Sequence, residues 1–592
     1  MDSLKTKIKS ILEWVRHLWL SLGLSGKALS ASDEVDKKLV YSLSPRKIPN
    51  GQQFSHLKKF LNPKEFLIIK ICFLVIIVNA IYLGIIFTKD HLQYLPASGG
   101  DYIEGIVGYP QTLNPLYAVN RDVDSDISRL IYSRLFKYDN NGHLSYDLVD
   151  NMEASEDNKE YLLTIKQGVK WHNGGELTVD DILFTFNLIK NPNYRSPLRA
   201  SLNELTAEKV DDYTIRFKLT EPYAPFPELL MFGILPKSLW ENISPAAAPL
   251  SDLNLKPIGS GPFKFKSLVH SSQGDLRDYI LGANQDYYDG VPYLKTITFK
   301  FYTSTNEAVA ALNDKQVMGL SYLPFNNHSD VLTKNSLEFH ELLQPRIISL
   351  FFNTEKNKTL ADKDVRLALV KSLNRDEILN DTLAGAAVRA DGPIWSNSFA
   401  YNQDLIKYEY EPEAASTIIK DKPLELTLTV VDVGNNRDLA ENIKNYWEQT
   451  GVKVTLKMLA SEQAATVVKD RDFEVLLYGQ SVGGDPDVYV FWHSSQIGGS
   501  GLNLAAFSNS DADKLLADAR SNANNDERSE KYKQFQKIVS ENLPAIFLYS
   551  PTYTYIQVKT LQGFNGTAIV NPADRFDNAN SWYIHTSKKL TW

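Results

Sequence analysis

The sequence predicts an α/β fold that stands outside a membrane on one N-terminal transmembrane helix. Three observations lead to this prediction. Residues 215–219 and 296–301 alternate apolar and polar side chains, as strands do. Residues 424–456 follow the order strand, helix, strand, which is typical of α/β folds with largely parallel sheets. Residues 66–87 form the one long apolar run of the chain.

The apolar run is long enough to act as a membrane anchor. As a helix it would extend roughly 33 Å, which spans the hydrocarbon core of a bilayer. Lys70 lies near one end of the run, where its side chain can reach the interface, and Asn79 is the other clearly polar residue. We expect the run to stay in the mature protein, because a cleaved signal peptide has a shorter apolar core. The alternative is a late-starting signal peptide cut near residues 96–98.

Charge is unevenly distributed along the chain. Residues 1–65 carry a net charge of +6, whereas residues 101–592 carry −15. So acidic an outer part argues against nucleic acid as a partner. Lys58, Lys59 and Lys64 directly precede the run and place the N-terminus in the cytoplasm by the positive-inside rule. We therefore expect a single-pass protein of the cell membrane with a large extracytoplasmic domain.

The cytoplasmic segment, residues 1–65, contains a second pattern. Apolar residues recur at helical spacing over residues 4–22, and basic residues lie off that stripe. This indicates an amphipathic helix suited to an anionic membrane surface, or alternatively one docked on another protein. Residues 23–65 resemble a polar linker, and residues 88–100 link the anchor to the outer domain.

Cysteine and histidine usage gives no indication of a metal or cofactor. Cys72 is the only cysteine, so no intrachain disulfide and no cysteine-based zinc site can form. No lipobox precedes Cys72, so lipid anchoring there is not expected. The histidines are scattered, and we expect no cofactor and no metal.

Residues 163–182 contain the most specific local pattern of the outer part. A strand leads into a turn around Gly174 and Gly175, and a helix then begins with Thr178 as its cap. Asp181 falls in the first turn of that helix, where a carboxylate is favourable. His172 in the turn invites a catalytic reading, but within this pattern we expect a structural or surface histidine.

From residue 102 to its end, the chain resembles the family-5 extracellular solute-binding proteins, the class that contains oligopeptide and dipeptide receptors. The resemblance is spread over the whole outer part, which makes it stronger than any single motif. The matching stretches are residues 111–116, 131–139, 163–182, 259–263, 284–293, Asn353, 364–369, 374–376, 485–487 and 543–549.

This resemblance implies a periplasmic-binding-protein-like fold of type II, with two lobes, a hinge and an extra domain. Lobe I would be discontinuous, the extra domain would lie within it, and lobe II would follow. The implied ranges are 101–143, 251–350 and 549–592 for lobe I, 144–250 for the extra domain, and 351–548 for lobe II. The resemblance also implies a monomer, not an enzyme, that captures its ligand between the lobes and delivers it to the permease and ATPase subunits of an ABC importer.

One segment departs from the family pattern. In peptide receptors of this family, a Gly-Trp-x-x-Asp-x-x-Asp-Pro segment supplies the Asp that pairs with the peptide's amino terminus. Residues 479–486 are one residue shorter, with Gln480 in place of Trp and Val482 or Gly483 where that Asp would fall. The resemblance thus implies a peptide ligand, and an oligosaccharide or another polar solute remains the alternative.

We expect ligand-binding residues at the end of the strand 473–478, because ligands of open α/β sheets bind beyond the carboxyl ends of strands. Asp485 and Asp487 should line the cleft as solvent-facing carboxylates. The full set of expected ligand-binding residues is Tyr478, Gln480, Asp485, Asp487, Trp492, Trp395, Arg346 and Asn353. For the aromatic residues the alternative is a place in the core of lobe II, and for the two acids it is a structural role.

Two other classes of function compete with a transport receptor. A glycosidase could use Asp485 and Asp487 as paired carboxylates, but two positions on one loop make the required separation uncertain. A membrane-anchored sensor or scaffold could instead bind a cytoplasmic partner through residues 1–65.

Overall fold

The computed structural model describes residues 61–383 and 385–590. The amphipathic helix expected at 4–22 and most of the linker expected at 23–65 lie outside the described residues. The chain divides into two compact units. One contains the described residues up to Tyr94 and from Lys588 on, and the other comprises Leu95–Ser587.

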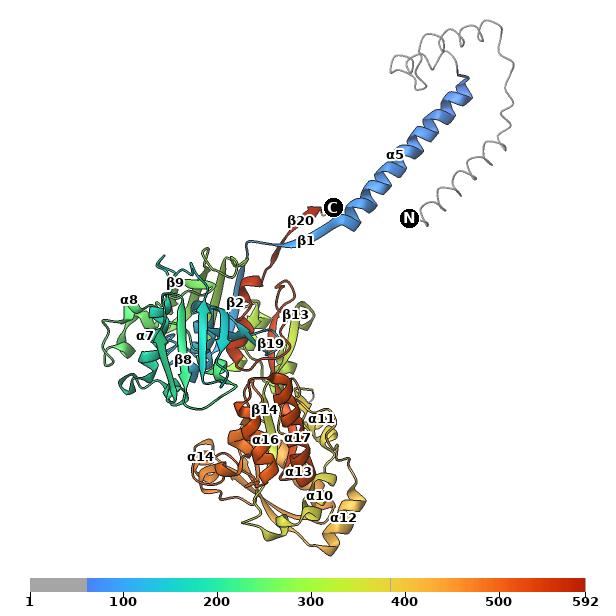
Figure 1. Cartoon of the computed structure of the whole chain (residues 1–592). Helices are drawn as coiled ribbons and strands as arrows, with labels where there is room; N and C mark the ends of the chain where they lie inside the picture. Colours follow the sequence, from blue (N-terminus) through green and yellow to red (C-terminus); the bar gives the residue numbers. More distant parts are fainter. Residues whose placement is uncertain (1–60, 384, 591–592) are drawn as a thin grey trace. The chain divides into compact units, whose positions relative to one another are not determined.

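Helix α5 (Pro63–His91) contains the predicted anchor (Figure 1). Asn62 and Glu65 form a capping box at its start, and Pro63 occupies the first helical position, where its missing N–H is not needed. The helix is long and apolar enough to cross a membrane, and an 18-residue window within it has a mean hydropathy of 2.7. Asn79 donates its amide to the main-chain oxygen of Val75 at 2.8 Å, so this polar side chain is satisfied within the helix.

A long mixed sheet organises residues 95–587. Its strand order is β17-β16-β18-β14-β19-β12-β2-β11-β10-β9, and β13 and β15 pair with β19 off this path. The bounds are β2 (Asp101–Val107), β9 (Phe263–His270), β10 (Leu276–Ala283), β11 (Thr296–Tyr302), β12 (Gly319–Leu320), β13 (Leu337–Leu343), β14 (Arg346–Phe352), β15 (Ala387–Arg389), β16 (Glu425–Val431), β17 (Lys453–Leu459), β18 (Val475–Ser481) and β19 (Ala545–Val558).

Strand β19 belongs to both lobes. Its first residues, 545–549, pair with β14 in lobe II, and residues 552–558 pair with β13 in lobe I. The chain also crosses between the lobes from β13 to β14, through residues 344–345. The lobes are therefore connected by two neighbouring extended segments (Figure 1).

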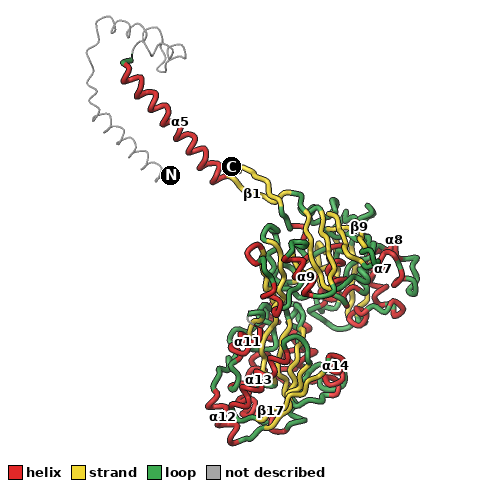
Figure 2. The backbone as a smooth tube through the Cα atoms, turned by 180° about the vertical axis from the view of Figure 1, so that it is seen from behind, coloured by secondary structure: helices red, strands yellow, loops and turns green. Residues whose placement is uncertain are grey.

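Lobe II is a three-layer arrangement because its strands are buried on both faces. On β14, Leu350 and Phe352 belong to one apolar cluster, while Ile347 and Phe351 belong to another. This alternation follows from the two-residue period of a strand. Helices cover both faces: α10 (Lys363–Lys371), α11 (Arg375–Leu383), α12 (Pro412–Asp421) and α13 (Asn436–Gln449) on one side, α16 (Ser510–Ser521) and α17 (Asn525–Asn542) on the other. All six are labelled in Figure 1, and Figure 2 shows α11, α12 and α13 from behind.

The expected extra domain is built on an antiparallel sheet with order β5-β6-β8-β7. Its core is continuous with that of lobe I, because Leu163 and Phe217 belong to the same apolar cluster as Tyr102 and Ile297.

The other helices and strands of the described chain have the following bounds: β3 (Phe136–Tyr138), β4 (Leu144–Tyr146), β5 (Val149–Ala154), β6 (Glu160–Ile165), β7 (Leu205–Lys209), β8 (Thr214–Leu219), α6 (Asp122–Ile131), α7 (Val179–Lys190), α8 (Lys237–Trp240), α9 (Thr305–Asn313), α14 (Ser461–Asp470), α15 (Tyr489–Trp492), β1 (Leu92–Ala97) and β20 (His585–Leu590).

The expectation of largely parallel sheets needs correction. Among the strand pairs of the large sheet, parallel pairing is confined to β16 with β17 and β18, and to β2 with β11 and β12. The strand–helix–strand pattern at 424–456 does form a parallel pair. The other strand pairs of this sheet are antiparallel, because β19 returns between the lobes and β9, β10 and β11 form a meander.

Candidate functional site

The loop after strand β18 lies at the interface between lobe II and the segment containing β3 and the short helix η4 (Phe226–Leu230). Gly483 adopts a φ of +75°, which glycine tolerates without strain. At Gly484 a Cβ atom would stand 2.6 Å from the Tyr138 ring, so a side chain there would collide with β3. The two glycines therefore let the loop approach the opposite wall of the interface closely.

Asp485 does not face solvent as the sequence led us to expect. Its carboxylate lies 2.5 Å from the Arg528 guanidinium, and that arginine side chain is 3% exposed. Arg528 also donates to the main-chain oxygen of Ala519 at 3.2 Å. Asp485 Oδ1 accepts the N–H of Asp487 at 3.0 Å, which fixes the turn around Pro486. The acid is thus part of a buried network that joins the loop to helix α17.

Asp487 pairs with a second arginine. Its carboxylate lies 3.4 Å from Arg520, whose guanidinium is placed over the rings of Tyr223 and Tyr489 at 5.0 and 4.6 Å. Burial raises the pKa of Asp487, and Arg520 opposes that rise. The N–H of Ala224 donates to the main-chain oxygen of Arg520 at 2.8 Å, so this cluster bridges the two walls directly.

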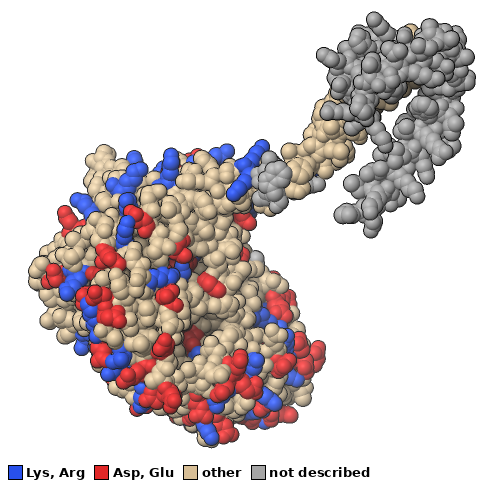
Figure 3. Space-filling view, turned by 45° about the horizontal axis from the view of Figure 1, so that its top comes forward, with Lys and Arg blue, Asp and Glu red and all other residues tan. Residues whose placement is uncertain are grey.

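Glu228 on η4 is the third acid of the interface, and the sequence did not identify it. Burial and the Asp485 carboxylate raise its pKa to about 7. The Tyr138 hydroxyl and the Asp485 N–H interact with its carboxylate and favour the ionised form. The site therefore combines acids from two distant parts of the chain. Figure 3 shows a recess on one face of the molecule with acidic side chains around it.

The other expected residues on β18 differ in exposure. Tyr478 is half-buried against the lobe II core. Gln480 is 6% exposed and donates its amide to the main-chain oxygen of Leu502 at 3.1 Å. Its hydrogen bond holds the loop that follows α15, which is a structural role.

The two expected tryptophans lie in the core. Trp395 and Trp492 are each 1% exposed and belong to the same apolar cluster of lobe II. Trp492 packs against Phe351 and Phe547, with ring centroids 6.3 and 5.7 Å away. These two side chains therefore belong to the core of lobe II, which was the alternative to ligand binding for the aromatic residues.

Arg346 and Asn353 stand at opposite ends of β14. Arg346 is exposed and packs over Gly479 of the neighbouring strand. Asn353 is 7% exposed, accepts the N–H groups of Glu355 and Lys356, and donates to the main-chain oxygen of Arg471. Asn353 closes a turn, and the structure does not bring it together with Asp485.

His172 likewise has a structural role. The N–H of Gly259 donates to its Nδ1 at 3.1 Å, so Nε2 carries the hydrogen and donates to the main-chain oxygen of Gly261 at 3.1 Å. Burial lowers the pKa of His172 to about 4 and keeps it neutral. This histidine clamps the 259–261 segment, where a Cβ on Gly259 would stand 1.9 Å from the main-chain oxygen of Ile131.

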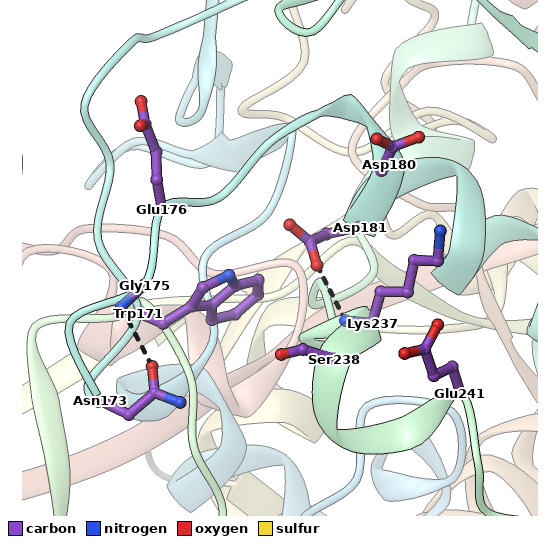
Figure 4. Close-up of a pocket in the computed structure, with 9 residues that line it drawn as sticks. All are labelled: Trp171, Asn173, Gly175, Glu176, Asp180, Asp181, Lys237, Ser238 and Glu241. Atoms are coloured by element: carbon purple, nitrogen blue, oxygen red, sulfur yellow. Dashed lines mark hydrogen bonds between the residues drawn. The ribbon is translucent and has the colours of Figure 1, made fainter.

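A separate cavity of about 400 Å³ opens in the extra domain (Figure 4). Its lining includes Trp171, Asp181 and Lys237. Asp181 is already used structurally, since it accepts the N–H groups of Thr178 and Lys237 at 3.0 and 2.8 Å. This cavity contains none of the residues predicted for the ligand. In the described ranges no group of three His, Cys, Asp or Glu residues is arranged to hold a metal ion.

Comparison with known proteins defines the class of this fold. The solved structure of the oligopeptide-binding protein AppA from Bacillus subtilis, in complex with a nonapeptide, aligns with a TM-score of 0.62 at 30% identity. The alignment covers 83% of this chain and 100% of AppA. The ABC transporter substrate-binding protein CtaP from Listeria monocytogenes aligns with a TM-score of 0.71 at 25% identity, covering 82% and 99%. The fold is that of a type II periplasmic binding protein.

The sequence comparison then gives the family. The model of bacterial extracellular solute-binding proteins, family 5 (middle region), matches residues 143–501, and this chain belongs to that family. AppA of Bacillus subtilis is 31% identical over 83% of this chain and 92% of its own length. The dipeptide-binding protein of Escherichia coli is 28% identical, over 80% and 93%. The resemblance identified from the motifs is confirmed.

Proposed function

We propose that this protein is a peptide receptor of an ABC importer, which captures a peptide between its lobes and delivers it to a permease. The observation that carries the proposal is the family membership, together with relatives that are named for oligopeptide and dipeptide binding. The arrangement of charged groups around Asp485, Asp487 and Glu228 supports it, since a peptide offers an ammonium group to such an interface.

The hinge motion follows from the connections between the lobes. Strand β19 and residues 344–345 are extended segments, and small changes in their backbone angles would swing lobe II as a body. From the sequence we expected lobe I at 101–143, 251–350 and 549–592, the extra domain at 144–250, and lobe II at 351–548. We propose the same division with one change: the boundary between lobes I and II lies at residues 344–345, so that the whole of β14 belongs to lobe II. The receptor acts as a monomer without turning its ligand over.

Helix α5 anchors the receptor in the cell membrane, with the N-terminus in the cytoplasm and residues 95–587 outside. Its permease and ATPase partners would then lie in the same membrane. Mass spectrometry of the protein from a membrane fraction tests the anchor: the mass of the uncleaved chain is expected, and a mature N-terminus near residues 96–98 would refute it.

Binding by the full-length protein in detergent tests the central proposal. Mixed-sequence peptides, with oligosaccharides in parallel, are titrated by calorimetry, and the recovered ligand is analysed by mass spectrometry. Saturable binding of intact peptides is expected, with a gain in stability of about 2.7 kcal/mol at a hundredfold excess over Kd. Binding of oligosaccharide alone would exclude a peptide receptor, and cleaved ligand would indicate an enzyme.

A further inference from the structure

Another cavity lies in lobe I, at the edge of the large sheet that the linker from α5 joins. Its volume is about 240 Å³. The described residues that line it include Ser98 of the linker and three lysines, and none of them is an acid. The three, called the cavity lysines below, are Lys264, Lys266 and Lys295.

The cavity lysines have no partner within the protein. In the described part of the chain, none of their ammonium groups donates a hydrogen bond or lies within 4.0 Å of a carboxylate. By contrast, Lys137 and Lys170 pair with Asp289 and Asp286, each at 3.3 Å. Residues 101–592 carry a net charge of −15, so a cavity lined by cations alone is an exception on this domain. Its chemistry is that of a site for an anion.

The register of the sheet places this cavity close to the linker. Lys264 on β9 pairs with Gly282 on β10, and Gly282 pairs with Thr296 on β11. Thr296 in turn pairs with Asp101, the first residue of β2. Neighbouring strands lie about 4.8 Å apart, so Lys264 is roughly 14 Å from the point where the chain enters the sheet. The Asp101 carboxylate accepts the Thr296 hydroxyl at 2.6 Å and does not line the cavity.

The linker is too short to hold this edge far from a membrane. Helix α5 ends at His91, and Ser98 follows seven residues later. Seven extended residues span roughly 23 Å. Tyr94 lies between them and is 60% exposed, and tyrosine is enriched where membrane and water meet. With Tyr94 at that interface, four residues, or roughly 13 Å, remain to Ser98. Lipid headgroups are therefore within reach of the cavity.

The strand that returns along the linker is also basic. β20 pairs with β1, and it contains Lys588 and Lys589 but no acid. The Lys588 ammonium lies 5.6 Å from the centre of the Tyr94 ring. Basic residues next to a transmembrane helix are attracted to anionic lipids. This second observation, independent of the cavity, indicates an anionic membrane surface.

We propose that the cavity lysines bind the phosphate group of an anionic phospholipid and so dock lobe I on the outer surface of the membrane. Lysine ammonium groups bind phosphate as point charges. A cavity of this volume is smaller than the roughly 300 Å³ at which pockets for drug-sized ligands begin, so it suits a headgroup better than a peptide. The inference rests on the proposed anchor. Lobe I would stay on the membrane while lobe II swings about the hinge.

Hydrogen exchange of β9 tests the docking. β9 is the last strand of the sheet, so its outer edge is unpaired and its amides are sensitive to a surface that covers it. The full-length protein is placed in vesicles of phosphatidylcholine alone, or of phosphatidylcholine and phosphatidylglycerol in equal parts. Residues 263–270 should exchange about tenfold or more slowly on the anionic vesicles. Salt at about 1 M should abolish the difference, because the Debye length falls to about 3 Å.

Two matched variants identify the groups responsible. The test variant replaces the cavity lysines: Lys264→Gln, Lys266→Gln and Lys295→Gln. The control removes the same charge from exposed lysines of lobe II: Lys358→Gln, Lys407→Gln and Lys420→Gln. The test variant should exchange equally on both vesicles, and the control should behave as wild type. If a melting curve shows that the test variant is unfolded, the double variant that spares the half-buried Lys264 takes its place.

Each other outcome has a definite meaning. Equal exchange of wild type on both vesicles overturns the docking, as does slowing that persists in the test variant. Slowing by inorganic phosphate in neutral detergent, to the extent seen on anionic vesicles, assigns the cavity to a soluble anion and overturns the lipid assignment. Slowing in native membranes but on neither vesicle assigns it to a protein partner, with the same consequence.

Flotation of the vesicles reports on the anchor separately. The full-length protein should float with both kinds of vesicle, whatever happens at the cavity. Failure to float with either kind overturns the proposed anchor and this inference with it. The peptide titration then still decides the receptor function by itself.

Discussion

The Arg528 guanidinium lies 2.5 Å from the Asp485 carboxylate, with 3% of the arginine side chain and 13% of the aspartate side chain exposed. Both groups belong to lobe II, so the pair stabilises the lobe whether or not the lobes are closed. Removing one partner of a buried pair leaves the other charge without compensation, which costs far more than the pair itself contributes.

Asp485→Asn is therefore expected to lower the free energy of unfolding by about 2 kcal/mol or more, because the asparagine leaves Arg528 buried without a counter-charge. Asp286→Asn is the control, since its pair with Lys170 is exposed and should contribute less than about 1 kcal/mol. Denaturant unfolding of both variants measures the difference. Equal stabilities would show that Asp485 is a free cleft carboxylate, as the sequence alone suggested.

Glu228 should make the ligand-free protein less stable as the pH rises. Its pKa is about 7 in the folded protein against 4.5 for an ordinary glutamate, so the folded state holds this proton more tightly. Stability conferred by the protonated form is complete below about pH 4.5 and is lost as the pH rises through about 7. The charged or titratable groups that face Glu228 are Asp485, Tyr138, Tyr223 and Arg528.

Glu228→Gln is accordingly expected to raise the free energy of unfolding by about 2 kcal/mol near pH 8 and to change it little near pH 4. The gain arises because the glutamine cannot ionise in the buried interface. Unfolding curves of the ligand-free protein at several pH values measure it, with Glu221→Gln as the exposed control. An unchanged pH profile in Glu228→Gln would contradict the assigned pKa.

His172 gives the opposite pH dependence. Its pKa of about 4 lies below the ordinary value of 6.5, so the folded state favours the neutral ring. Protonation of Nδ1 would break the hydrogen bond from the Gly259 N–H, and stability should fall as the pH drops from about 6.5 to about 4. His172→Gln should flatten this part of the profile by on the order of 2 kcal/mol, whereas His270→Gln, at an exposed residue, should not. If the stabilities of the two variants fell equally steeply between about pH 6.5 and pH 4, His172 would not be a buried neutral histidine.

Local rules predicted the local structure well. Thr178 and Asp181 form a capping box at the start of α7, where the sequence predicted a helix capped by Thr178. The strand expected at 424–431 is β16, since alternation and length were sufficient to define it. These features depend on residues a few positions apart, which one sequence contains in full.

The site could be predicted only in part, because its partners are distant in sequence. The loop containing Asp485 was recognisable from its glycines and carboxylates after a strand. Nothing near it in the chain indicates Arg528, Arg520 or Glu228, which meet it through the tertiary fold. The parallel-sheet prediction failed for the same reason, since the antiparallel return of β19 is a long-range pairing.

Gly484→Ala should hinder closure of the lobes while sparing the fold. The new Cβ would stand 2.6 Å from the Tyr138 ring across the interface, whereas the φ of Gly484 is not in the left-handed region and imposes no strain on alanine. Peptide affinity is expected to fall by about tenfold or more, because the closed state becomes less populated. The melting temperature should stay close to that of wild type.

The matched control for this substitution is Gly282→Ala, where the nearest atom would be 3.7 Å away on the flexible side chain of Lys266. It should leave both affinity and stability unchanged. Adding Tyr138→Ala to Gly484→Ala should restore part of the lost affinity, since the obstructing ring is removed; this double variant separates a clash at closure from damage to the loop. Calorimetric titration with one and the same peptide measures the peptide affinity of all of these variants. Wild-type affinity in Gly484→Ala would show that the β18 loop and β3 do not meet in the ligand-bound state.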